Sequence, residues 1–311
     1  MSSQVLICGS VAFDTIAVFE GRFKEHILPD RIHALSVSFL VPTMRKEFGG
    51  CAGNIAYNLK LLGGQPVPVA TVGQDAGDYL ERFKRLGIPT EHIRLIPDMF
   101  TAQCFITTDL DDNQITAFHP GAMDRSADND ATSQGAAWAI VAPDSKAGML
   151  AHVDRLSKAG IPFIFDLGQA MPLFDGPDLL SVFGKARALA FNDYEASVVE
   201  ERTGRTPQSL AEDLDAVVVT RGAEGATLYL AGQAIDIAPI NPTAVVDPTG
   251  CGDAHRAGLL HGLTQGWSWE KACMLGNVMG SLKIASRGPQ NHNPSLAEIG
   301  TLMRSTYGVT L

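Results

Sequence analysis

Residues 245–258 read VVDPTGCGDAHRAG and join an apolar run, a tight turn and a segment with the pattern of a helix. The apolar run predicts a strand that ends at Asp247, and the small residues that follow the turn predict a closely packed helix. Gly250, Cys251 and Gly252 would lie at the N-terminus of this helix, where free backbone N–H groups and the positive end of the helix dipole bind anions. The stretch therefore predicts a strand, a turn and a helix with an anion site at the turn.

Asp253 follows this turn directly, and a carboxylate there has two interpretations. An acidic residue in the first turn of a helix ordinarily stabilises the helix through its dipole. Beside an anion site, however, a carboxylate repels a phosphate unless another group lies between them. A hydroxyl that Asp253 deprotonates is such a group. The stretch thus favours phosphoryl transfer to a hydroxyl, with Asp253 as the general base and the amides of residues 250–253 as the anion hole.

Short β-type runs recur along the chain, and most are followed by a helical pattern. The predicted strands are residues 5–8, 67–72, 138–141, 162–166, 188–191 and 216–220, and the predicted helices are residues 54–62, 77–86, 146–159, 195–203, 253–264 and 270–286. This alternation predicts an α/β fold, in which helices cover both faces of a mainly parallel sheet. Ala231 and Gly232 separate two further β-type runs and predict a hairpin at an antiparallel edge of the sheet.

Two regions interrupt the alternation, residues 15–47 and residues 101–122. The second region reads as two strands joined by an acidic turn at residues 109–113. We expect the two regions to form a small sheet outside the main sheet. The chain shows no internal repeat or long linker, so residues 1–311 are predicted to form a single domain.

Composition excludes several classes of protein. The chain has 311 residues, 45% of them hydrophobic, and a formal charge of −10, which disfavours nucleic acid and anionic membranes as partners. Its longest apolar stretch, residues 136–142, is far short of the roughly 20 residues that cross a bilayer, and residues 1–5 lack the features of a signal peptide. Five widely spaced cysteines without a C-x-x-C pair fit reduced thiols, so we expect a cytoplasmic protein.

The opening stretch resembles the D-[TP]-[TN]-G-[AC]-G-D signature of the ribokinase-like (PfkB) family of carbohydrate and nucleoside kinases. More motifs of this family follow in order: CGSVAFDTI at residues 8–16, EFGGCAGNIAYNLKLLG at 47–63, FNDYEA at 191–196 and VVTRGAEG at 218–225. Pro248, Cys251 and His255 depart from the commoner residues of the signature. The resemblance implies a three-layer α/β/α ribokinase-like fold with a mainly parallel central sheet and a small β-sheet lid, and it implies ATP and Mg²⁺ as cofactors.

The resemblance also implies the residues that bind the substrate hydroxyls, which are Asp14, Gly49, Gly50 and Asn54. Asp14 would lie at the C-terminal end of a strand, where a carboxylate can accept hydrogen bonds from two vicinal hydroxyls, and the Asn54 amide offers both a donor and an acceptor. Two plainer interpretations stay open: Asp14 is an acid of a surface turn, and Asn54 is the N-cap of the helix that follows it.

On the nucleotide side, the resemblance implies that Thr220, Gly222 and Gly225 line the phosphates and that Asn277 lies near the adenine. Asn192 and Glu195 correspond to a pair that holds Mg²⁺ largely through water, and hard oxygen ligands suit this ion. A helix N-terminus with a glutamate in its first turn is the alternative interpretation of that pair.

The resemblance further implies a monovalent cation, usually K⁺, next to the anion hole. Its ligands would be Asp247, Thr249 and backbone carbonyls of residues 285–288. In the alternative interpretation Asp247 simply ends its strand.

The segments around these motifs favour a nucleoside over a sugar as substrate. Ribokinases usually have a lysine after the Gly-Gly pair, where this chain has Cys51. DDNQITAFHPGAM and FIFDLGQAM resemble instead the bacterial adenosine and broad-specificity nucleoside kinases of the family, in which an aromatic ring of the small sheet stacks on the nucleobase. Phe118 matches that ring and Gln169 can hydrogen-bond the base edge, although Phe118 as an ordinary strand residue stays open.

We therefore predict an ATP-dependent nucleoside kinase that phosphorylates the 5′-hydroxyl of ribonucleosides such as adenosine, inosine, guanosine or cytidine. A sugar kinase of the same family, ribokinase-like or fructokinase-like, is the alternative. A non-catalytic nucleoside or sugar sensor is less favoured because Asp253 and the glycine turn are intact. We expect the small sheet to close over the substrate and exclude water, and the protein to be a monomer or a homodimer.

Overall fold

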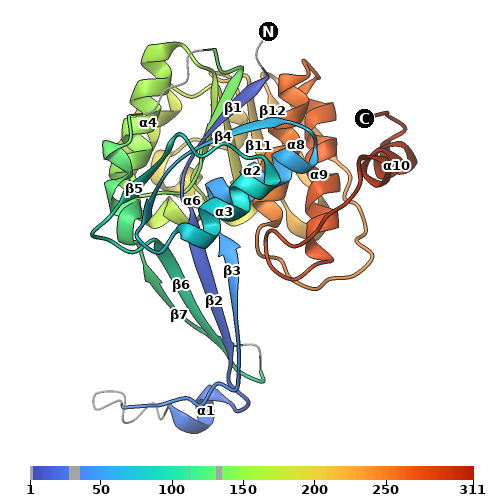
Figure 1. The fold of residues 1–311 in the computed structure, drawn as a ribbon. Coiled ribbons are helices and arrows are strands. Elements are labelled where there is room, and N and C mark those ends of the chain that lie inside the picture. Colours follow the sequence, from blue (N-terminus) through green and yellow to red (C-terminus); the bar gives the residue numbers. More distant parts are fainter. Residues whose placement is uncertain (1–2, 28–35, 112, 131–134) are drawn as a thin grey trace.

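The protein is described by a computed structural model, which covers residues 3–27, 36–111, 113–130 and 135–311. These residues form two sheets of different size. Figure 1 shows a large body of strands and helices from which a smaller sheet projects. The start of β1 lies on the side of the body away from this projection.

The main sheet has the strand order β13-β12-β11-β10-β9-β8-β1-β4-β5. Its strands are β1 (Gln4–Cys8), β4 (Gln65–Gly73), β5 (Ile93–Ile96), β8 (Trp138–Val141), β9 (Phe163–Asp166), β10 (Ala188–Asn192), β11 (Ala216–Thr220), β12 (Ala226–Leu230) and β13 (Gln233–Ile237). Neighbours from β11 to β5 pair in parallel, whereas β12 and β13 form an antiparallel hairpin at one edge. The predicted parallel sheet and its antiparallel edge are confirmed.

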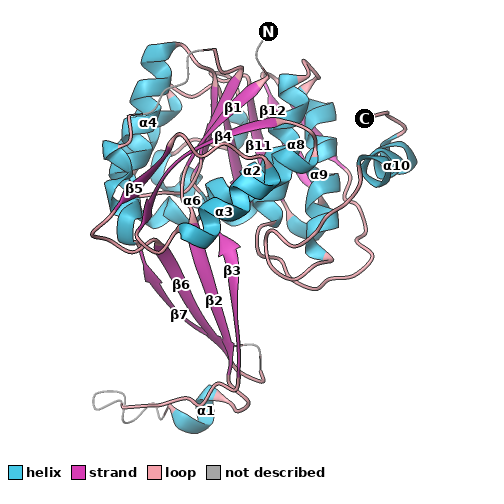
Figure 2. Ribbon diagram, in the orientation of Figure 1, coloured by secondary structure: helices cyan, strands magenta, loops and turns pink. Residues whose placement is uncertain are grey.

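Helices cover both faces of the main sheet (Figure 2). One core cluster includes Val5 and Ile7 of β1 together with side chains of α2 (Cys51–Leu61), α3 (Gly77–Leu86), α8 (Cys251–Thr264) and α9 (Trp269–Ile284). A second includes Leu6 and Cys8 with side chains of α4 (Lys146–Ala159), α5 (Gly176–Phe183), α6 (Asp193–Thr203) and α7 (Pro207–Leu210). Successive side chains of a strand point to opposite faces, so one apolar run supplies both cores. A third cluster packs α10 against α9. This is the predicted three-layer α/β/α architecture.

The helices have the following bounds: α1 (Phe23–His26), α2 (Cys51–Leu61), α3 (Gly77–Leu86), α4 (Lys146–Ala159), α5 (Gly176–Phe183), α6 (Asp193–Thr203), α7 (Pro207–Leu210), α8 (Cys251–Thr264), α9 (Trp269–Ile284) and α10 (Leu296–Tyr307). The 3-10 helices within the described residues are η2 (Gly121–Asp128), η3 (Gly168–Leu173) and η4 (Gly222–Glu224). Among the described helices, none has the length and apolar composition needed to span a membrane.

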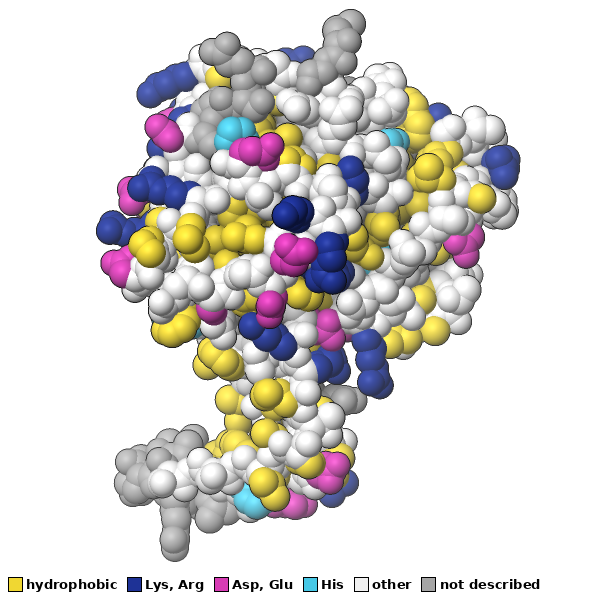
Figure 3. Space-filling model, viewed as in Figure 1, with side chains coloured by type: hydrophobic (Ala, Val, Ile, Leu, Met, Phe, Trp, Pro, Cys, Tyr) yellow, Lys and Arg dark blue, Asp and Glu magenta, His cyan; other side chains and the backbone are white. Residues whose placement is uncertain are grey.

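The small sheet, which we call the lid, has the strand order β3-β2-β6-β7. Its strands are β2 (Ala12–Val18), β3 (Thr43–Gly49), β6 (Ala102–Thr108) and β7 (Gln114–His119). Phe13 of β2 and Phe48 of β3 pack against the ring of Tyr79 in α3, with ring centroids 5.5 and 5.1 Å apart, and this contact anchors the lid to the body. Hydrophobic side chains lie along the projecting lid (Figure 3). The predicted small sheet is confirmed.

The predicted strand that ends at Asp247 is wrong. Val245 and Val246 lie outside the sheets and are 76% and 45% exposed. The N–H groups of Val246 and Asp247 both donate to the carbonyl of Ile284 at the end of α9, at 2.9 and 3.1 Å. The edge of the main sheet is formed by β13, and residues 245–247 do not pair with it. The N–H groups of Val246 and Asp247 bond instead to the end of α9.

Two other expectations about element ends are also corrected. The first strand ends at Cys8, and Asp14 is the third residue of β2, a separate strand that belongs to the lid. Helix α2 starts at Cys51, with Gly50 before it as N-cap, so Asn54 lies inside the helix and is not its cap. In both cases the break falls at a turn near small residues. The local pattern reveals neither which sheet the strand after Cys8 joins nor at which residue the helix after Gly50 begins.

Candidate active site

The turn predicted to bind an anion lies at the start of α8. Gly250 precedes the helix with a φ of 80°, a left-handed conformation that glycine adopts without strain. The N–H of Cys251 donates to the carbonyl of Pro248 at 3.1 Å, so this group is used within the turn. The N–H groups of Gly252 and Asp253 belong to the first helical turn, in which the helix itself offers no acceptor. These two amides are therefore the ones suited to an anion.

Asp253 is the third residue of α8, and its carboxylate is bonded from another helix. The Nδ2 atom of Asn54, in α2, donates to Oδ2 of Asp253 at 2.8 Å. Asn54 is 4% exposed. The two residues are 199 positions apart in the chain, so the fold brings together two motifs that the sequence pointed to separately.

A third residue, Gln290, holds Asn54 in place. Gln290 is 1% exposed, and its Nε2 donates to Oδ1 of Asn54 at 3.0 Å and to the hydroxyl of Tyr79 at 2.7 Å. The Tyr79 hydroxyl donates to the carbonyl of Gly49 at 2.7 Å. The carboxylate of Asp253 and the carbonyl of Gly49 both accept hydrogen bonds. The Gln290 amide nitrogen therefore donates toward both ends, to Asn54 on one side and to Tyr79 on the other. We call these five residues the polar chain, and it joins the carboxylate to the end of the lid strand β3.

The pKa of the Asp253 carboxyl is raised from 3.8 to about 6. Loss of contact with water is the main cause; the hydrogen bond from Asn54 opposes it, the negative charge of Asp166 adds to it, and the positive charge of Arg256 opposes it. A carboxyl of this pKa is ionised at neutral pH and still accepts a proton more readily than an ordinary aspartate does. Asp253 therefore has the protonation behaviour of a general base.

A buried ion pair lies one helical turn along α8 from Asp253. Arg256 is 4% exposed, and its Nε donates at 3.0 Å to Oδ2 of Asp166, the last residue of β9. The Nη1 atom of Arg256 has no hydrogen-bond partner among the described residues. Loss of either partner would leave a buried charge unpaired, which is strongly destabilising.

Asp14 lies in a row of side chains on one face of the lid. The register pairs Asp14 with Glu47 of β3 and with Cys104 of β6, and it pairs Cys104 with Phe118 of β7. Residues directly opposite one another in a sheet point to the same face. The Asp14 carboxylate and the Phe118 ring therefore share a face, and Phe118 is 51% exposed.

Gly49 makes room for the Asp14 carboxylate. A Cβ atom at Gly49 would lie 2.3 Å from Oδ2 of Asp14, so a larger residue would displace this carboxylate. Loss of water contact, then the charges of Glu47 and Asp247, raise the pKa of Asp14 from 3.8 to about 6. Gly50 follows, with a φ of 82°.

The residues predicted for the nucleotide phosphates meet at one edge of the main sheet. Asn192 and Thr220 end two neighbouring parallel strands and are paired in the register. Gly222 and Gly225 follow in the turn after β11, with φ values of 54° and 86°. Ligands of open α/β sheets bind outside the carboxyl ends of the strands, which is where these four residues lie.

Asn192 and Glu195 form a capping box at the start of α6. The Oδ1 atom of Asn192 accepts from the N–H of Glu195 at 2.7 Å, and the two carboxylate oxygens of Glu195 accept from the N–H and the Nδ2 of Asn192 at 2.8 and 2.9 Å. The plainer interpretation of this pair is thus correct, but each carboxylate oxygen keeps a lone pair for a metal-bound water. Within the described part of the chain, no group of three or more His, Cys, Asp and Glu residues is arranged to hold a metal ion.

Asn277 has partners of its own on α9. Its Nδ2 donates to the carbonyl of Ala238 at 3.1 Å and lies 3.4 Å from the hydroxyl of Tyr307. It therefore links α9 to the segment after β13 and to α10, and a contact with adenine stays a prediction.

The residues predicted to hold a monovalent cation surround a lysine. The Asp247 carboxylate accepts from the N–H of Thr249 and from the N–H of Gly288, both at 2.9 Å. The Nζ of Lys283 donates to the carbonyl of Asp247 at 2.7 Å and to that of Ser286 at 3.1 Å. An ammonium group thus lies among the backbone oxygens that the sequence predicted for the ion.

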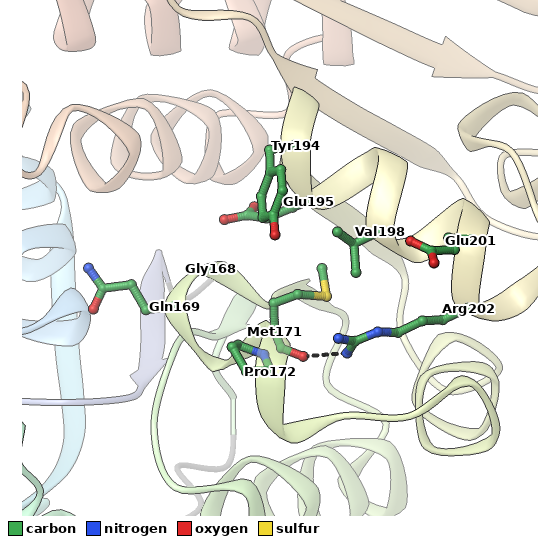
Figure 4. A pocket seen from close by; sticks show the side chains of 9 residues that line it. All are labelled: Gly168, Gln169, Met171, Pro172, Tyr194, Glu195, Val198, Glu201 and Arg202. Carbon is green, nitrogen blue, oxygen red and sulfur yellow. Dashed lines mark hydrogen bonds between the residues drawn. The ribbon is translucent and has the colours of Figure 1, made fainter. Parts of the chain in front are cut away.

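A hollow of about 570 Å³ lies beside Glu195, between η3 and α6 (Figure 4). Arg202 lines it and donates to the carbonyl of Met171 at 2.7 Å. In Figure 4 the amide of Gln169 points away from Tyr194 and Arg202. Gln169 is exposed, and its predicted contact with a nucleobase would be made on the other side from Arg202.

The sequence did not predict five residues that place buried polar groups in the site: Tyr79, Asp166, Arg256, Lys283 and Gln290. Arg256 and Lys283 each stand in a helical run of small and apolar residues, AHRAGLL and MGSLKIA. A charged residue in such a run is a signal, since lysine and arginine are buried almost only with a partner. The signal does not identify the partner, which comes from another part of the chain.

A buried carboxylate beside free amides at a helix N-terminus can serve phosphoryl transfer to a hydroxyl, because the same turn can bind the phosphoryl group and place the base. The fold and the site are thus those expected of a phosphotransferase that acts on an alcohol. The pfkB family of carbohydrate kinases matches residues 8–296, and the chain belongs to this family.

Solved structures of nucleoside kinases resemble the whole chain. The nucleoside kinase of Burkholderia thailandensis in complex with inosine is 48% identical, with a TM-score of 0.89 over 98% of this chain and 99% of that one. The nucleoside kinase of Methanocaldococcus jannaschii is 26% identical, with a TM-score of 0.89 over 98% and 99% of the two chains. The ribokinase of Arabidopsis thaliana, at 19% identity and a TM-score of 0.80 over 98% and 99%, shares the fold. The chain is thus an ATP-dependent kinase of the ribokinase-like fold. Of these three structures, the two nucleoside kinases have a higher sequence identity to the chain than the ribokinase does.

Proposed function

We propose that the chain phosphorylates the 5′-hydroxyl of ribonucleosides, with ATP as donor and adenosine, inosine, guanosine or cytidine as candidate acceptors. The observation that carries this proposal is the Asp253 carboxylate, which lies on the first turn of α8 and is held by Asn54 at 2.8 Å. The similar kinase of Burkholderia thailandensis binds inosine, which favours a nucleoside over a free sugar.

Asp14 and Phe118 would bind the two halves of the nucleoside. The carboxylate accepts hydrogen bonds from the ribose diol, and the ring stacks on the base, with Gln169 at the base edge. Both side chains face the same side of the lid, as one ligand that contacts both requires. Gly49 and Gly50 leave room for the sugar to approach the backbone.

In the reaction, Asp253 accepts the proton of the 5′-hydroxyl while the oxygen of that hydroxyl attacks the γ-phosphorus of ATP. A bond forms between this oxygen and the phosphorus, the bond from the phosphorus to the β–γ bridging oxygen breaks, and ADP leaves with that electron pair. The amides of Gly252 and Asp253 stabilise negative charge on the transferred group.

Mg²⁺ would neutralise charge on the ATP phosphates when it is bound. The carboxylate of Glu195 suits this ion because its oxygens are hard ligands and keep lone pairs beyond the capping box. Thr220, Gly222 and Gly225 would line the phosphates, with Asn192 beside them. We expect the enzyme to be cytoplasmic, where ATP is available, and to be a monomer or a homodimer.

The test is an ADP-release assay of the purified protein against adenosine, inosine, guanosine, cytidine, ribose and fructose 6-phosphate. The proposal expects the highest kcat/KM with a nucleoside. Phosphorylation of a sugar but of no nucleoside would replace the proposal by the sugar-kinase alternative. The absence of ADP release with every acceptor, from a protein that still binds a nucleoside, would favour the sensor.

A further inference from the structure

Lys283 is buried at the end of α9, next to the turn that precedes the anion hole. The residue is 0% exposed, and its Nζ donates to the carbonyl of Asp247 at 2.7 Å and to that of Ser286 at 3.1 Å. A lysine is almost never fully buried unless its charge is paired or solvated by oxygen atoms. The position therefore calls for an explanation beyond packing.

The ammonium group connects three segments of backbone. The first is the turn at residues 247–249, the second is the end of α9, and the third is the loop at residues 285–288. Asp247 fixes the first to the third, because its carboxylate accepts from the N–H of Thr249 and of Gly288. Gly250, whose φ of 80° opens α8, follows this turn directly. A cation at Lys283 thus fixes the backbone from which the anion-binding amides start.

The oxygens that accept from Lys283 are among those that the family resemblance predicted for K⁺, namely Asp247, Thr249 and the carbonyls of residues 285–288. Two of these backbone acceptors, the carbonyls of Asp247 and Ser286, already accept from the ammonium group, and the Asp247 carboxylate is bonded by two N–H groups. A second positive charge among them would be repelled by the first. The residues present therefore do not fit a monovalent metal ion.

We infer that Lys283 takes the place of the monovalent cation, so that a covalently attached charge organises the anion hole and the enzyme does not need K⁺. Lys283 is a positioning residue in this arrangement, because it acts through the turn at residues 247–250 and not on the phosphate itself. The inference rests on the proposed function, since it concerns the anion hole of that reaction.

The experiment compares the wild-type protein with Lys283→Ser and Lys283→Met in potassium chloride and in tetramethylammonium chloride. Serine removes the charge and leaves room for an ion, whereas methionine removes the charge and fills the space. Lys271→Met, which changes an outer lysine of the same helix that lies over the Trp267 ring, is the matched control.

We expect wild-type and Lys271→Met kcat to be equal in the two salts within about twofold. In tetramethylammonium chloride, kcat of both Lys283 variants should fall about tenfold or more. Removing a donor of an anion hole itself costs about a hundredfold or more in kcat, and Lys283 acts on the donors only through the turn. Potassium should restore much of the activity of Lys283→Ser and little of that of Lys283→Met.

A wild-type enzyme that is inactive until K⁺ is added would overturn the inference, as would a Lys283→Met variant of full activity in tetramethylammonium. Restoration of both variants alike, or of neither, would overturn it too. The melting temperature gives a readout without turnover: K⁺ should raise the melting temperature of Lys283→Ser above its value in tetramethylammonium chloride and leave that of the wild type unchanged. This arm still tests the inference if no nucleoside is phosphorylated, an outcome that would contradict only the proposed function.

Discussion

The protonation of Asp253 sets the pH range in which the base is available. Burial raises the pKa of its carboxyl from 3.8 to about 6, so the ionised form is present above that pH and is lost as the pH falls through it. We expect kcat/KM, which reports the ionisation of the enzyme before substrate binds, to fall below about pH 6, because a protonated carboxyl does not accept the hydroxyl proton. The measurement is kcat/KM for the nucleoside from about pH 5 to pH 8. Unfolding is monitored over the same range, and a profile that stays flat to pH 5 in the folded protein would contradict the assignment.

Phe118 is the residue on which the choice of a nucleoside depends. Phe118→Ala should weaken nucleoside binding by about 1–3 kcal/mol, because a base loses its stacking partner. Phe105→Ala is the control: this ring is 46% exposed on the neighbouring strand, but the register places it on the opposite face of the lid. Calorimetric titration with the preferred nucleoside measures the affinity of both variants. Equal affinities of the two variants would remove Phe118 from the base site.

The motif residues of the site could be predicted from the sequence, and their supporting partners could not. Asp253 and Asn54 belong to short patterns whose chemistry is local. Gln290 contacts Asn54 across 236 positions of the chain, and no local pattern carries that information. Asn192 and Glu195 show the converse, since their capping box was predictable from spacing alone.

The polar chain links two elements, the start of α8 and the end of β3. Gln290→Met keeps the length of the side chain and removes both N–H donors, so Asn54 loses the bond that orients its amide toward Asp253. We expect kcat to fall about tenfold with KM little changed, because the base is misplaced while the substrate contacts remain. The acid limb of the pH profile should move to higher pH, since the bond from Asn54 lowers the pKa of Asp253.

His292→Leu is the matched control for this prediction. His292 lies in the same loop and is 4% exposed, but its Nε2 is bonded to Asn58. Asn58 in turn donates to the backbone carbonyl of Asn54 and not to the side-chain amide that bonds Asp253. Both variants are expected to lose stability, and only Gln290→Met is expected to move the pH profile. If both variants shift the profile equally, the polar chain has no specific part in catalysis.

Elements buried on both faces were the most predictable part of the fold. The strands β1, β8, β10 and β11 are continuous apolar runs, which is the pattern of a parallel sheet covered by helices. The run before Asp247 has a similar pattern and forms no strand, because a local pattern does not tell whether a sheet edge is free. Its N–H groups bond to Ile284 instead.

At the scale of the whole molecule, the lid and the body carry different halves of the site. Asp14 and Phe118 are on the lid, whereas Asp253 is on α8, so a substrate that contacts all three would lie between the two parts. We expect the lid to turn toward the body when a nucleoside binds, pivoting near Gly49 and Gly50. Crystal structures with and without the nucleoside measure this movement. A lid that superposes in both states would show that the site needs no closure.

The charge of −10 fits an enzyme of a small anionic donor better than a binder of polyanions. We propose that ATP is bound by uncharged amides and by a divalent metal, and that Lys283 supports the turn from which those amides start. The acidic residues have separate tasks in this account: Asp14 binds the sugar, Glu195 lies near the metal and Asp253 accepts the proton.

The turnover of Asp253→Asn tests the central claim most directly. The amide keeps the size of the side chain but does not accept the hydroxyl proton, so kcat for the preferred nucleoside should fall by about two to four orders of magnitude. Nucleoside binding, measured by calorimetry, should be retained. Asp78→Asn, at an exposed acid in the first turn of α3, should turn over like the wild type. A folded Asp253→Asn enzyme that keeps kcat within about tenfold of the wild type would contradict Asp253 as the general base.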